Sequence, residues 1–442
     1  MSGQVAPVES IMPLRLNTRD DGFESAFTAF LSMKREVSQD VDDIVRDIIG
    51  QVIARGDEAL VELSAKFDRI DLTKISMRVS DEELDAAAAL CDPAALEALR
   101  FAHARIKRFH EEQRPQDKRF TDHLGVDLGW RWSALESVGL YVPGGTASYP
   151  SSVLMNAVPA KVAGVDRLVM VAPAPDGRIN PLVLAAARIA GVDEVYRIGG
   201  AQAVAALAYG TKSIAPVAKI VGPGNAFVAA AKRRVFGTVG IDMIAGPSEV
   251  LVMADGSANP DWIAADLLAQ AEHDAAAQSI LLTDDASLAD AVIASLERQL
   301  ASLPRKEIAG ASWRDFGCVI VCDKLGDSIP LVNRMAPEHL EIMSEDADAL
   351  AGKVRNAGAI FIGGHTPEAI GDYVGGSNHV LPTARSARFS SGLGVLDFMK
   401  RTSILKCTPE ALRALGPAAI ALGEAESLTA HARSVSIRLN LG

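Results

Sequence analysis

Four of the eight histidines stand in short polar segments in the second half of the chain. Each of these segments also carries a carboxylate or an amide side chain. Imidazole nitrogens and carboxylate oxygens are common metal ligands, and they are also the groups that most often transfer protons in enzymes. The pattern therefore predicts an active site assembled around a metal from QAEHD (270–274), APEHLEI (336–342), GDYVGGSNHVLPT (371–383) and AESLTAHARS (425–434).

The first two segments suggest different tasks. Gln270 and His273 are three residues apart, so they share one face of a helix and can bind one metal ion together. An exposed helix end is the alternative. Glu338 and His339 are adjacent, so they point in different directions and suit two separate roles. A histidine is the natural general base near neutral pH, and a glutamate can activate water. The alternative there is a capped helix start.

The other two segments are a loop and a helical tail. The glycine-rich loop 371–383 follows the apolar run AIFIGG, and loops at the carboxyl ends of parallel strands are common ligand sites. Its Asp372 and His379 are compatible with a metal. Glu426 and His431 are five residues apart, so the helix brings them only loosely together. We expect solvated surface positions for the remaining histidines, which are His103, His110, His123 and His365.

Two glycine-bearing junctions could contact a nucleotide. YVPGGTASYPS (141–151) and VGPGNAF (221–227) each follow an apolar run and lead into a helical pattern. Backbone amides at such a junction favour an anion such as a pyrophosphate. Neither junction matches GxGxxG, so by spacing alone dinucleotide binding is the less favoured interpretation.

A sheet framework must bring these segments together. Alanine-rich amphipathic segments separate eight short apolar runs, which is typical of parallel sheets with crossover helices. The fold class predicted is α/β, with two Rossmann-like parallel-sheet domains. The runs are VGLYV, RLVMVAP, VYRIGG, KIVGPG, EVLVMAD, SILLTDD, CVIVCD and AIFIGG.

The pattern predicts four parts of the chain. They are an N-terminal helical layer (1–130), the two Rossmann-like domains (131–240 and 241–385) and a small C-terminal helical tail (386–442). Gly56 and Pro93 interrupt the N-terminal helices, and Thr408 is the predicted N-cap of the tail helix. The tail is too small to fold alone, so we expect it to pack on another domain or subunit. A short strand, SIRLNLG, is predicted to close the chain.

Composition excludes several protein classes. The 442 residues carry a formal net charge of -12, which argues against a non-specific nucleic-acid or anionic-membrane surface. No apolar run approaches the roughly twenty residues of a membrane span, and a signal-peptide pattern is missing. The cysteines form neither a zinc knuckle nor a CxxC motif. We therefore expect inert thiols and a cytoplasmic protein; the cysteines are Cys91, Cys318, Cys322 and Cys407.

Taken together, the segments resemble the histidinol dehydrogenase family. The matching stretches, in family order, are VGLYVPGG, RIGGAQAVAALAYGT, VGPGNAFV, AGPSEVLV, DLLAQAEH, APEHLE, GDYVGGSNHVLPT and LTAH. The resemblance covers almost the whole chain and is strongest from about Val138 onward. It implies oxidation of L-histidinol to L-histidine through an aldehyde, with two NAD and one bound zinc.

The resemblance also implies residue roles. Zinc would be bound by Gln270, His273, Asp372 and His431, and Glu338 and His339 would be the acid–base pair. The substrate would contact the metal ligands, His339, Ser248, Glu426 and His379. NAD would contact Tyr141, Gln202 and Asn225 of the first Rossmann-like domain. The family is a homodimer, so Glu426 and His431 would come from the partner's tail.

Two other function classes remain open. A zinc hydrolase of a small polar metabolite would use the same ligands and Glu338 to activate water. A non-catalytic binding protein with two lobes would have purely structural histidines. Reduction of NAD with histidinol separates the dehydrogenase from the hydrolase. Loss of turnover with a retained fold in Glu338→Gln or His339→Asn separates it from the binding protein.

Overall fold

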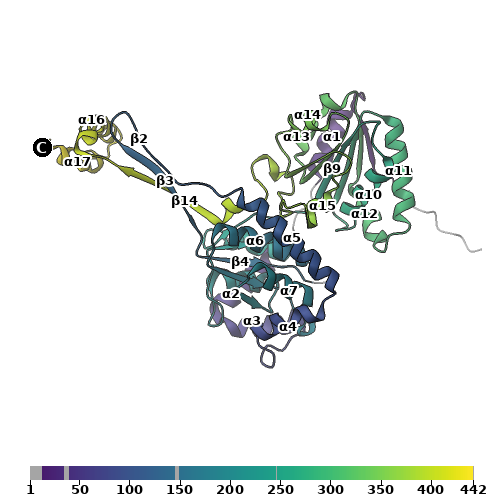
Figure 1. The fold of residues 1–442 in the computed structure, drawn as a ribbon, viewed down its shortest axis with the longest axis horizontal. Helices are drawn as coiled ribbons and strands as arrows, with labels where there is room; N and C mark the ends of the chain where they lie inside the picture. The colour runs from purple at the N-terminus through teal and green to yellow at the C-terminus, as the bar shows by residue number, and fades with distance from the viewer. Residues whose placement is uncertain (1–11, 34–38, 145–148, 245, 442) are drawn as a thin grey trace, which may run out of the picture.

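The molecule consists of two α/β units and an arm that extends from one of them (Figure 1). This computed structural model describes residues 12–33, 39–144, 149–244 and 246–441. Each unit has one parallel sheet with helices packed on it, and the arm is a three-stranded antiparallel sheet that carries two helices. No helix among the described residues is long and apolar enough to cross a membrane.

The first unit has a five-stranded parallel sheet in the order β6-β5-β4-β7-β8. Its strand cores are almost wholly apolar, as expected for a sheet covered on both faces. The strands are β4 (Ser137–Tyr141), β5 (Arg167–Val171), β6 (Glu194–Tyr196), β7 (Lys219–Val221) and β8 (Gly240–Ile241). The helices between them are α6 (Pro150–Ala163), α7 (Pro181–Ala190), α8 (Gly200–Tyr209) and α9 (Ala226–Val235).

The second unit has a six-stranded parallel sheet in the order β1-β11-β10-β9-β12-β13. The strands are β1 (Leu14–Asn17), β9 (Glu249–Ala254), β10 (Gln278–Thr283), β11 (Cys318–Val321), β12 (His339–Met343) and β13 (Ala359–Ile362). The helices are α1 (Phe23–Ser32), α10 (Pro260–Ala271), α11 (Ala286–Leu300), α12 (Lys306–Phe316), α13 (Ile329–Met335), α14 (Ala347–Ala351) and α15 (Glu368–Tyr373).

The predicted fold class is confirmed. All eight apolar runs form strands, and the chain passes from one parallel sheet to the other near residue 240. Two strands of the second sheet were not foreseen. One is β1, which precedes the whole first unit in sequence, and the other is β12, where APEHLEI had an open interpretation as a helix start.

The predicted N-terminal helices pack mainly on the first unit. They are α2 (Gln39–Arg55), α3 (Asp57–Asp68), α4 (Asp81–Ala87) and α5 (Pro93–Glu111), separated at Gly56 and before Pro93 as expected. α2 and α3 share a core with α8 and α9, whereas Leu99 and Ile106 of α5 pack into the core around α6. α5 also reaches the loop that follows α15, through Arg105, which donates to the carbonyls of Val374 and Gly375.

The arm joins segments from distant parts of the chain. β2 (Lys118–Thr121), β3 (Asp127–Ala134) and β14 (Met399–Lys406) form its sheet, and α16 (Pro409–Ala425) and α17 (Thr429–Ser436) lie at its end (Figure 1). Thr408 caps α16 as predicted. The predicted closing strand is wrong, because residues 437–439 continue α17 as a short 3-10 turn. Leu439 packs against Gly416 of α16, which holds the chain end against that helix.

Candidate active site

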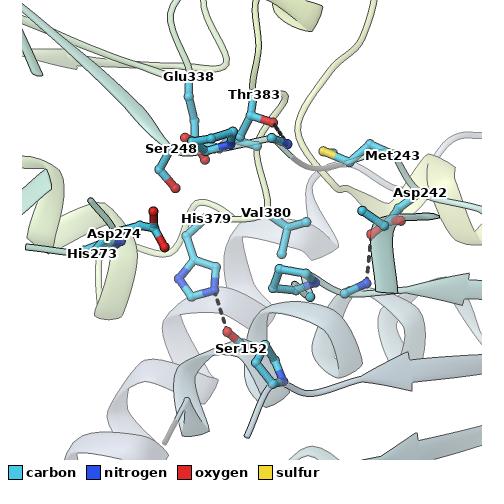
Figure 2. A pocket seen from close by; sticks show the side chains of 18 of the residues that line it. Ser152, Asp242, Met243, Ser248, His273, Asp274, Glu338, His379, Val380 and Thr383 are labelled. Carbon is cyan, nitrogen blue, oxygen red and sulfur yellow. Dashed lines mark hydrogen bonds between the residues drawn. The ribbon is translucent and has the colours of Figure 1, made fainter. Parts of the chain in front are cut away.

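A cavity of about 530 Å³ lies between the two α/β units. The first unit contributes Ser152, the turn 222–224, Lys232 and Asp242, and the second contributes most of the predicted polar residues. Figure 2 shows this arrangement, with His379 between residues from both units. The predicted residues that line the cavity are Ser248, His273, Glu338, His339, Asp372 and His379.

Glu338 and His339 are held by one residue of the neighbouring strand. The backbone N–H of Glu249, the first residue of β9, donates to the Glu338 carboxylate over 3.0 Å. The carbonyl of Glu249 is 3.1 Å from His339 Nδ1. A carbonyl oxygen can only accept, so Nδ1 carries the proton and Nε2 of a neutral His339 keeps a free lone pair. The two side chains are therefore oriented for separate roles.

Burial sets the protonation of this pair. It lowers the pKa of His339 to about 3, so the imidazole is neutral at pH 7 and can accept a proton. Burial also raises the pKa of Glu338 well above its ordinary value, and the nearby carboxylates of Glu249 and Asp372 raise it further. A neutral base next to a carboxyl group with a raised pKa is an arrangement suited to proton transfer.

His379, Asp372 and Ser152 form a second polar group on the cavity wall. His379 Nδ1 donates to the backbone carbonyl of Asp372 over 3.0 Å, and His379 Nε2 lies 3.3 Å from the Ser152 hydroxyl. Burial lowers the pKa of His379 to about 4, so this imidazole is also neutral and accepts from Ser152. The Asp372 side chain lies near His339, with its Oδ1 at 3.8 Å from His339 Nε2.

Gln270 is buried without any hydrogen-bond partner. It is 0% exposed, and within the described part of the chain neither its amide oxygen nor its amide nitrogen has a partner. An unsatisfied buried amide costs about 1–3 kcal/mol, so a native structure normally supplies a partner for it. Gln270 precedes the cavity-lining His273 by one helical turn. The residues present therefore fit a metal that takes nitrogen and oxygen ligands.

A purely geometric grouping of ligand atoms gives a partly different set. Among the described residues, His339, Glu368 and Asp372 have possible ligand atoms within 4.8 Å of one another. Asp372 belongs to both sets. His339 Nδ1 is already bonded to Glu249, and burial raises the pKa of Glu368 well above its ordinary value, which favours the neutral carboxyl. The unsatisfied amide of Gln270 favours the set in which Asp372 is combined with Gln270 and His273.

The predicted cofactor residues do not line the cavity. Tyr141 is buried, and its hydroxyl accepts from the backbone N–H of Gly200 over 3.0 Å. Gln202 is also buried, beside Gly200. Asn225 is exposed, and its side chain caps α9 by accepting from Phe227 and Val228. Asn225 directly follows the turn 222–224 of the cavity wall, and the Tyr141 carbonyl lies against Gly222 of that turn.

Glu426 and His431 lie far from the cavity of their own chain. Both are exposed at the end of the arm, on and just before α17, whereas Asp372 lies on α15 of the second unit (Figure 1). Within one chain, therefore, the predicted ligand His431 does not meet Gln270, His273 and Asp372.

The expectation of a surface position is wrong for His110. This residue is fully buried, its Nδ1 donates to the carbonyl of Ile106 over 2.7 Å, and Asn378 lies beside its Nε2. The burial of His110 cannot be predicted from the polar pattern of α5, because one buried histidine does not change the periodicity of the helix. His123 and His365 are exposed as expected, and His103 is half-buried. Sequence reasoning also missed Ser152, Lys232 and Asp242, which carry no motif signal.

Comparisons with known proteins show which family the chain belongs to. A family model described as histidinol dehydrogenase matches residues 31–439. The chain is 69% identical over 429 residues to a histidinol dehydrogenase of Rhodopseudomonas palustris, covering 97% of this chain and 100% of that protein. It is 68% identical over 430 residues to one of Bradyrhizobium diazoefficiens, with the same coverage. The crystal structure of histidinol dehydrogenase from Elizabethkingia anophelis matches with a TM-score of 0.92 and 36% identity, covering 97% of this chain and 98% of that chain.

Proposed function

Because the chain belongs to the histidinol dehydrogenase family, which comprises NAD-dependent oxidoreductases of histidine biosynthesis, we propose that it oxidises L-histidinol to L-histidine through histidinal, with two NAD and one zinc. The observation that carries the proposal is the cavity wall on which Glu249 orients Glu338 and His339. A primary alcohol needs a base for its hydroxyl proton, and an aldehyde needs an activated water before its second oxidation.

Zinc would be bound by Gln270, His273, Asp372 and the partner subunit's His431. The unsatisfied amide of Gln270 supports this choice, and so does the lack of a thiolate in the set, which suits a metal that binds substrate at expanded coordination. When bound, zinc supplies a fixed point for the amine and imidazole nitrogens of histidinol. Ser248, His379 and the partner subunit's Glu426 would complete the substrate site.

His339 and Glu338 would act in turn. His339 Nε2 takes the hydroxyl proton of histidinol in the first oxidation, which leaves the aldehyde. Glu338 then takes a proton from water as the water oxygen bonds to the aldehyde carbon, and the protonated His339 returns its proton to the carbonyl oxygen, which completes the hydrate. His339 is then neutral again and takes the hydroxyl proton of the hydrate in the second oxidation. Tyr141, Gln202 and Asn225 would hold NAD, which would supply the hydride acceptor for each oxidation. The two-unit cavity would keep the reactive aldehyde away from bulk water.

The arm would form a homodimer in which each tail completes the partner's site. Its support is the exposed position of Glu426 and His431, together with apolar side chains on the arm that face solvent in a single chain. Leu405, Leu422 and Ile437 are 68%, 64% and 60% exposed, which favours a surface covered by another subunit. We place the enzyme in the cytoplasm, where free cysteines such as Cys318 and Cys322 stay reduced.

A histidinol-dependent NADH assay on metal-analysed protein tests the proposal. We expect two NADH per histidinol, loss of activity with a strong chelator and recovery with zinc. His339→Asn should keep the fold and lower turnover by a factor of roughly 10²–10⁴, because an amide cannot accept the hydroxyl proton. Full turnover of metal-free protein would overturn the zinc assignment. Metal-dependent hydrolysis without NAD reduction would favour a hydrolase instead.

A further inference from the structure

A second polar cluster lies in the cavity, and no step of the proposed reaction uses it. Lys232 of α9 and Asp242, which follows β8, form an ion pair there. Their side chains are 3% and 1% exposed, although both residues line the cavity. Figure 2 shows Asp242 and Met243 on one side of the cavity and His273 with Asp274 on the opposite side.

This ion pair holds the backbone of Gly222 on both sides. Lys232 Nζ donates to the Gly222 carbonyl over 2.9 Å, and the Gly222 N–H donates to Asp242 Oδ2 over 2.8 Å. Gly222 has φ +109°, and a Cβ there would lie 2.2 Å from the carbonyl oxygen of Tyr141. The turn 222–224 is therefore held close to Tyr141 on the cavity wall, directly before Asn225.

A buried ion pair such as Lys232–Asp242 is by itself weak evidence for a stabilising role. Removing two charges from water is costly, and an apolar pair of similar volume is often at least as stable as a buried ion pair. A lysine ammonium has three N–H groups, and Asp242 and the Gly222 carbonyl use two of them. Because Lys232 lines the cavity, the third can reach an acceptor on a bound molecule.

We propose that Lys232 and Asp242 are positioning residues for NAD: they hold the turn 222–224 against the dinucleotide, and Lys232 donates to one of its oxygens. The inference rests on the proposed binding of NAD next to Tyr141, Gln202 and Asn225, beside the turn 222–224 of the cavity wall. Substrate would bind at the other side, near His273 and Glu338, so the pair should affect NAD and not histidinol.

The Lys232→Met variant of the zinc-loaded enzyme tests this role. We expect KM for NAD to rise about tenfold, while kcat at saturating NAD and KM for histidinol change by less than about twofold. The rise in Tm that NAD causes in the wild type should shrink. Because a lone buried Asp242 carboxylate also destabilises the fold, Lys232→Met/Asp242→Asn is the decisive variant.

The double variant separates positioning from stability. It carries no buried charge, and an asparagine oxygen can still accept from Gly222, so Tm should return toward the wild-type value. KM for NAD should stay raised, because the Gly222 carbonyl and the dinucleotide still lack the lysine donor. If KM for NAD returns to the wild-type value together with Tm, the pair has only a structural role and the inference is wrong.

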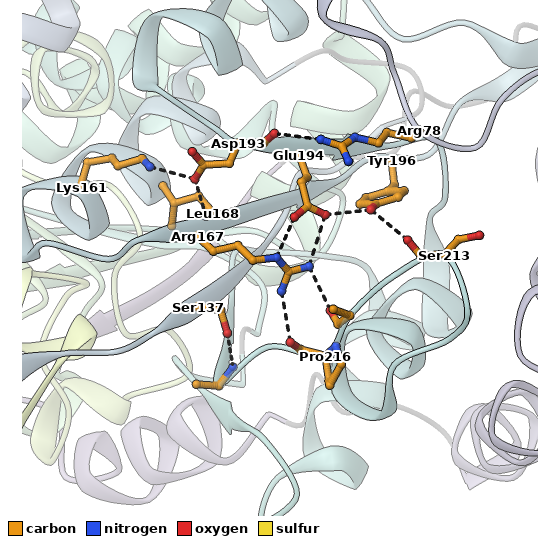
Figure 3. Close-up of polar contacts among 12 residues, drawn as sticks. Arg78, Ser137, Lys161, Arg167, Leu168, Asp193, Glu194, Tyr196, Ser213 and Pro216 are labelled. Atoms are coloured by element: carbon orange, nitrogen blue, oxygen red, sulfur yellow. Dashed lines mark hydrogen bonds and ion pairs between the residues drawn. The ribbon is translucent and has the colours of Figure 1, made fainter.

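Arg167 offers a matched control in the same unit. It pairs with Glu194 and donates to the carbonyls of Ala215 and Pro216, so it also combines an ion pair with backbone contacts (Figure 3). It stands at the start of β5, and neither Arg167 nor Glu194 lines the cavity. Arg167→Met should lower Tm and leave KM for NAD unchanged. An equal rise of KM in this variant would contradict a specific role of Lys232.

The outcomes also distinguish this inference from the proposed function. A wild type that binds NAD but does not oxidise histidinol contradicts the proposed function, and the NAD-dependent Tm shift still tests the pair. A wild type that oxidises histidinol, with an unchanged KM for NAD in both Lys232 variants, contradicts the inference alone.

Discussion

At the scale of single residues, one backbone unit decides how two side chains behave. The N–H and carbonyl of Glu249 point at Glu338 and His339 respectively, so the same peptide segment orients a carboxyl group and selects the tautomer of an imidazole. Burial then keeps His339 neutral and moves the pKa of Glu338 upward. Two adjacent residues therefore differ in protonation: one is a neutral imidazole and the other is a carboxyl group with a raised pKa.

The raised pKa of Glu338 predicts a pH dependence. Only the carboxylate can take a proton from water, and its fraction grows as the pH rises toward and through the raised pKa. We expect the rate of histidinal oxidation at saturating NAD to keep increasing with pH above the range in which an ordinary glutamate has already lost its proton. His339, with a pKa lowered to about 3, adds no loss of rate above about pH 5. Stopped-flow detection of NADH checks this.

Glu338→Gln is the control for that profile. An amide does not titrate, so the remaining slow rate should be independent of pH over the same range. A rise that persists unchanged in Glu338→Gln would show that another group limits the reaction.

At the scale of elements, a helix from the N-terminal region supports a loop of the second unit that lines the cavity. His110 of α5 lies next to Asn378, whose side chain donates to the Met155 carbonyl and accepts from the N–H of Val380. His379 stands between Asn378 and Val380 in the chain. α5 thus supports the loop that carries a cavity histidine, together with α6.

This contact predicts that alanine substitutions of two histidines in α5 have very different effects on stability and turnover. His110→Ala leaves a buried void and removes one of the hydrogen-bond partners of the Asn378 amide, so we expect a loss of about 2–4 kcal/mol in the free energy of unfolding and a several-fold lower kcat. His103→Ala, on the same helix, should change stability by less than about 0.5 kcal/mol and leave the kinetics unchanged. Urea unfolding and steady-state kinetics measure both. Equal effects of the two changes would contradict a specific role of His110.

At the scale of the whole molecule, the arm separates one part of the predicted site from the rest. The cavity lies between the two α/β units, while Glu426 and His431 are exposed at the end of the antiparallel sheet (Figure 1). A complete site in one chain would require the arm to fold back. Two chains related by a twofold axis can exchange their tails instead, which leaves both α/β units unchanged.

Tail exchange predicts complementation between inactive variants. In a heterodimer of His431→Ala and His339→Asn chains, one site has only wild-type residues. Random exchange at equal concentrations should restore about a quarter of the wild-type activity, because half of the dimers are mixed and each has one intact site. The NADH assay before and after subunit exchange measures the recovery.

A second mixture serves as the control. His431→Ala with Glu426→Ala places one defect in every site, so no activity should return. If the first mixture also stays inactive after native mass spectrometry confirms heterodimers, the shared site is wrong.

Local patterns in the sequence were enough to predict the α/β architecture and most of the segments that line the cavity. Strand and helix periodicity is set by neighbouring residues, and so are caps such as Thr408, which the structure confirms. The polar segments around His273, His339 and His379 were also visible, because buried polar residues interrupt apolar patterns. The family resemblance, now confirmed, rests on the same segments in order.

Only the tertiary structure decided which distant groups meet. Glu249 and His339 are ninety positions apart, and their contact follows from the pairing of β9 with β12, which no local pattern specifies. The Lys232–Asp242 pair depends in the same way on the close approach of α9 and the end of β8, and the burial of His110 depends on the loop that packs over α5. Separation along the chain carries no signal of such contacts, because they form only when whole elements pack together.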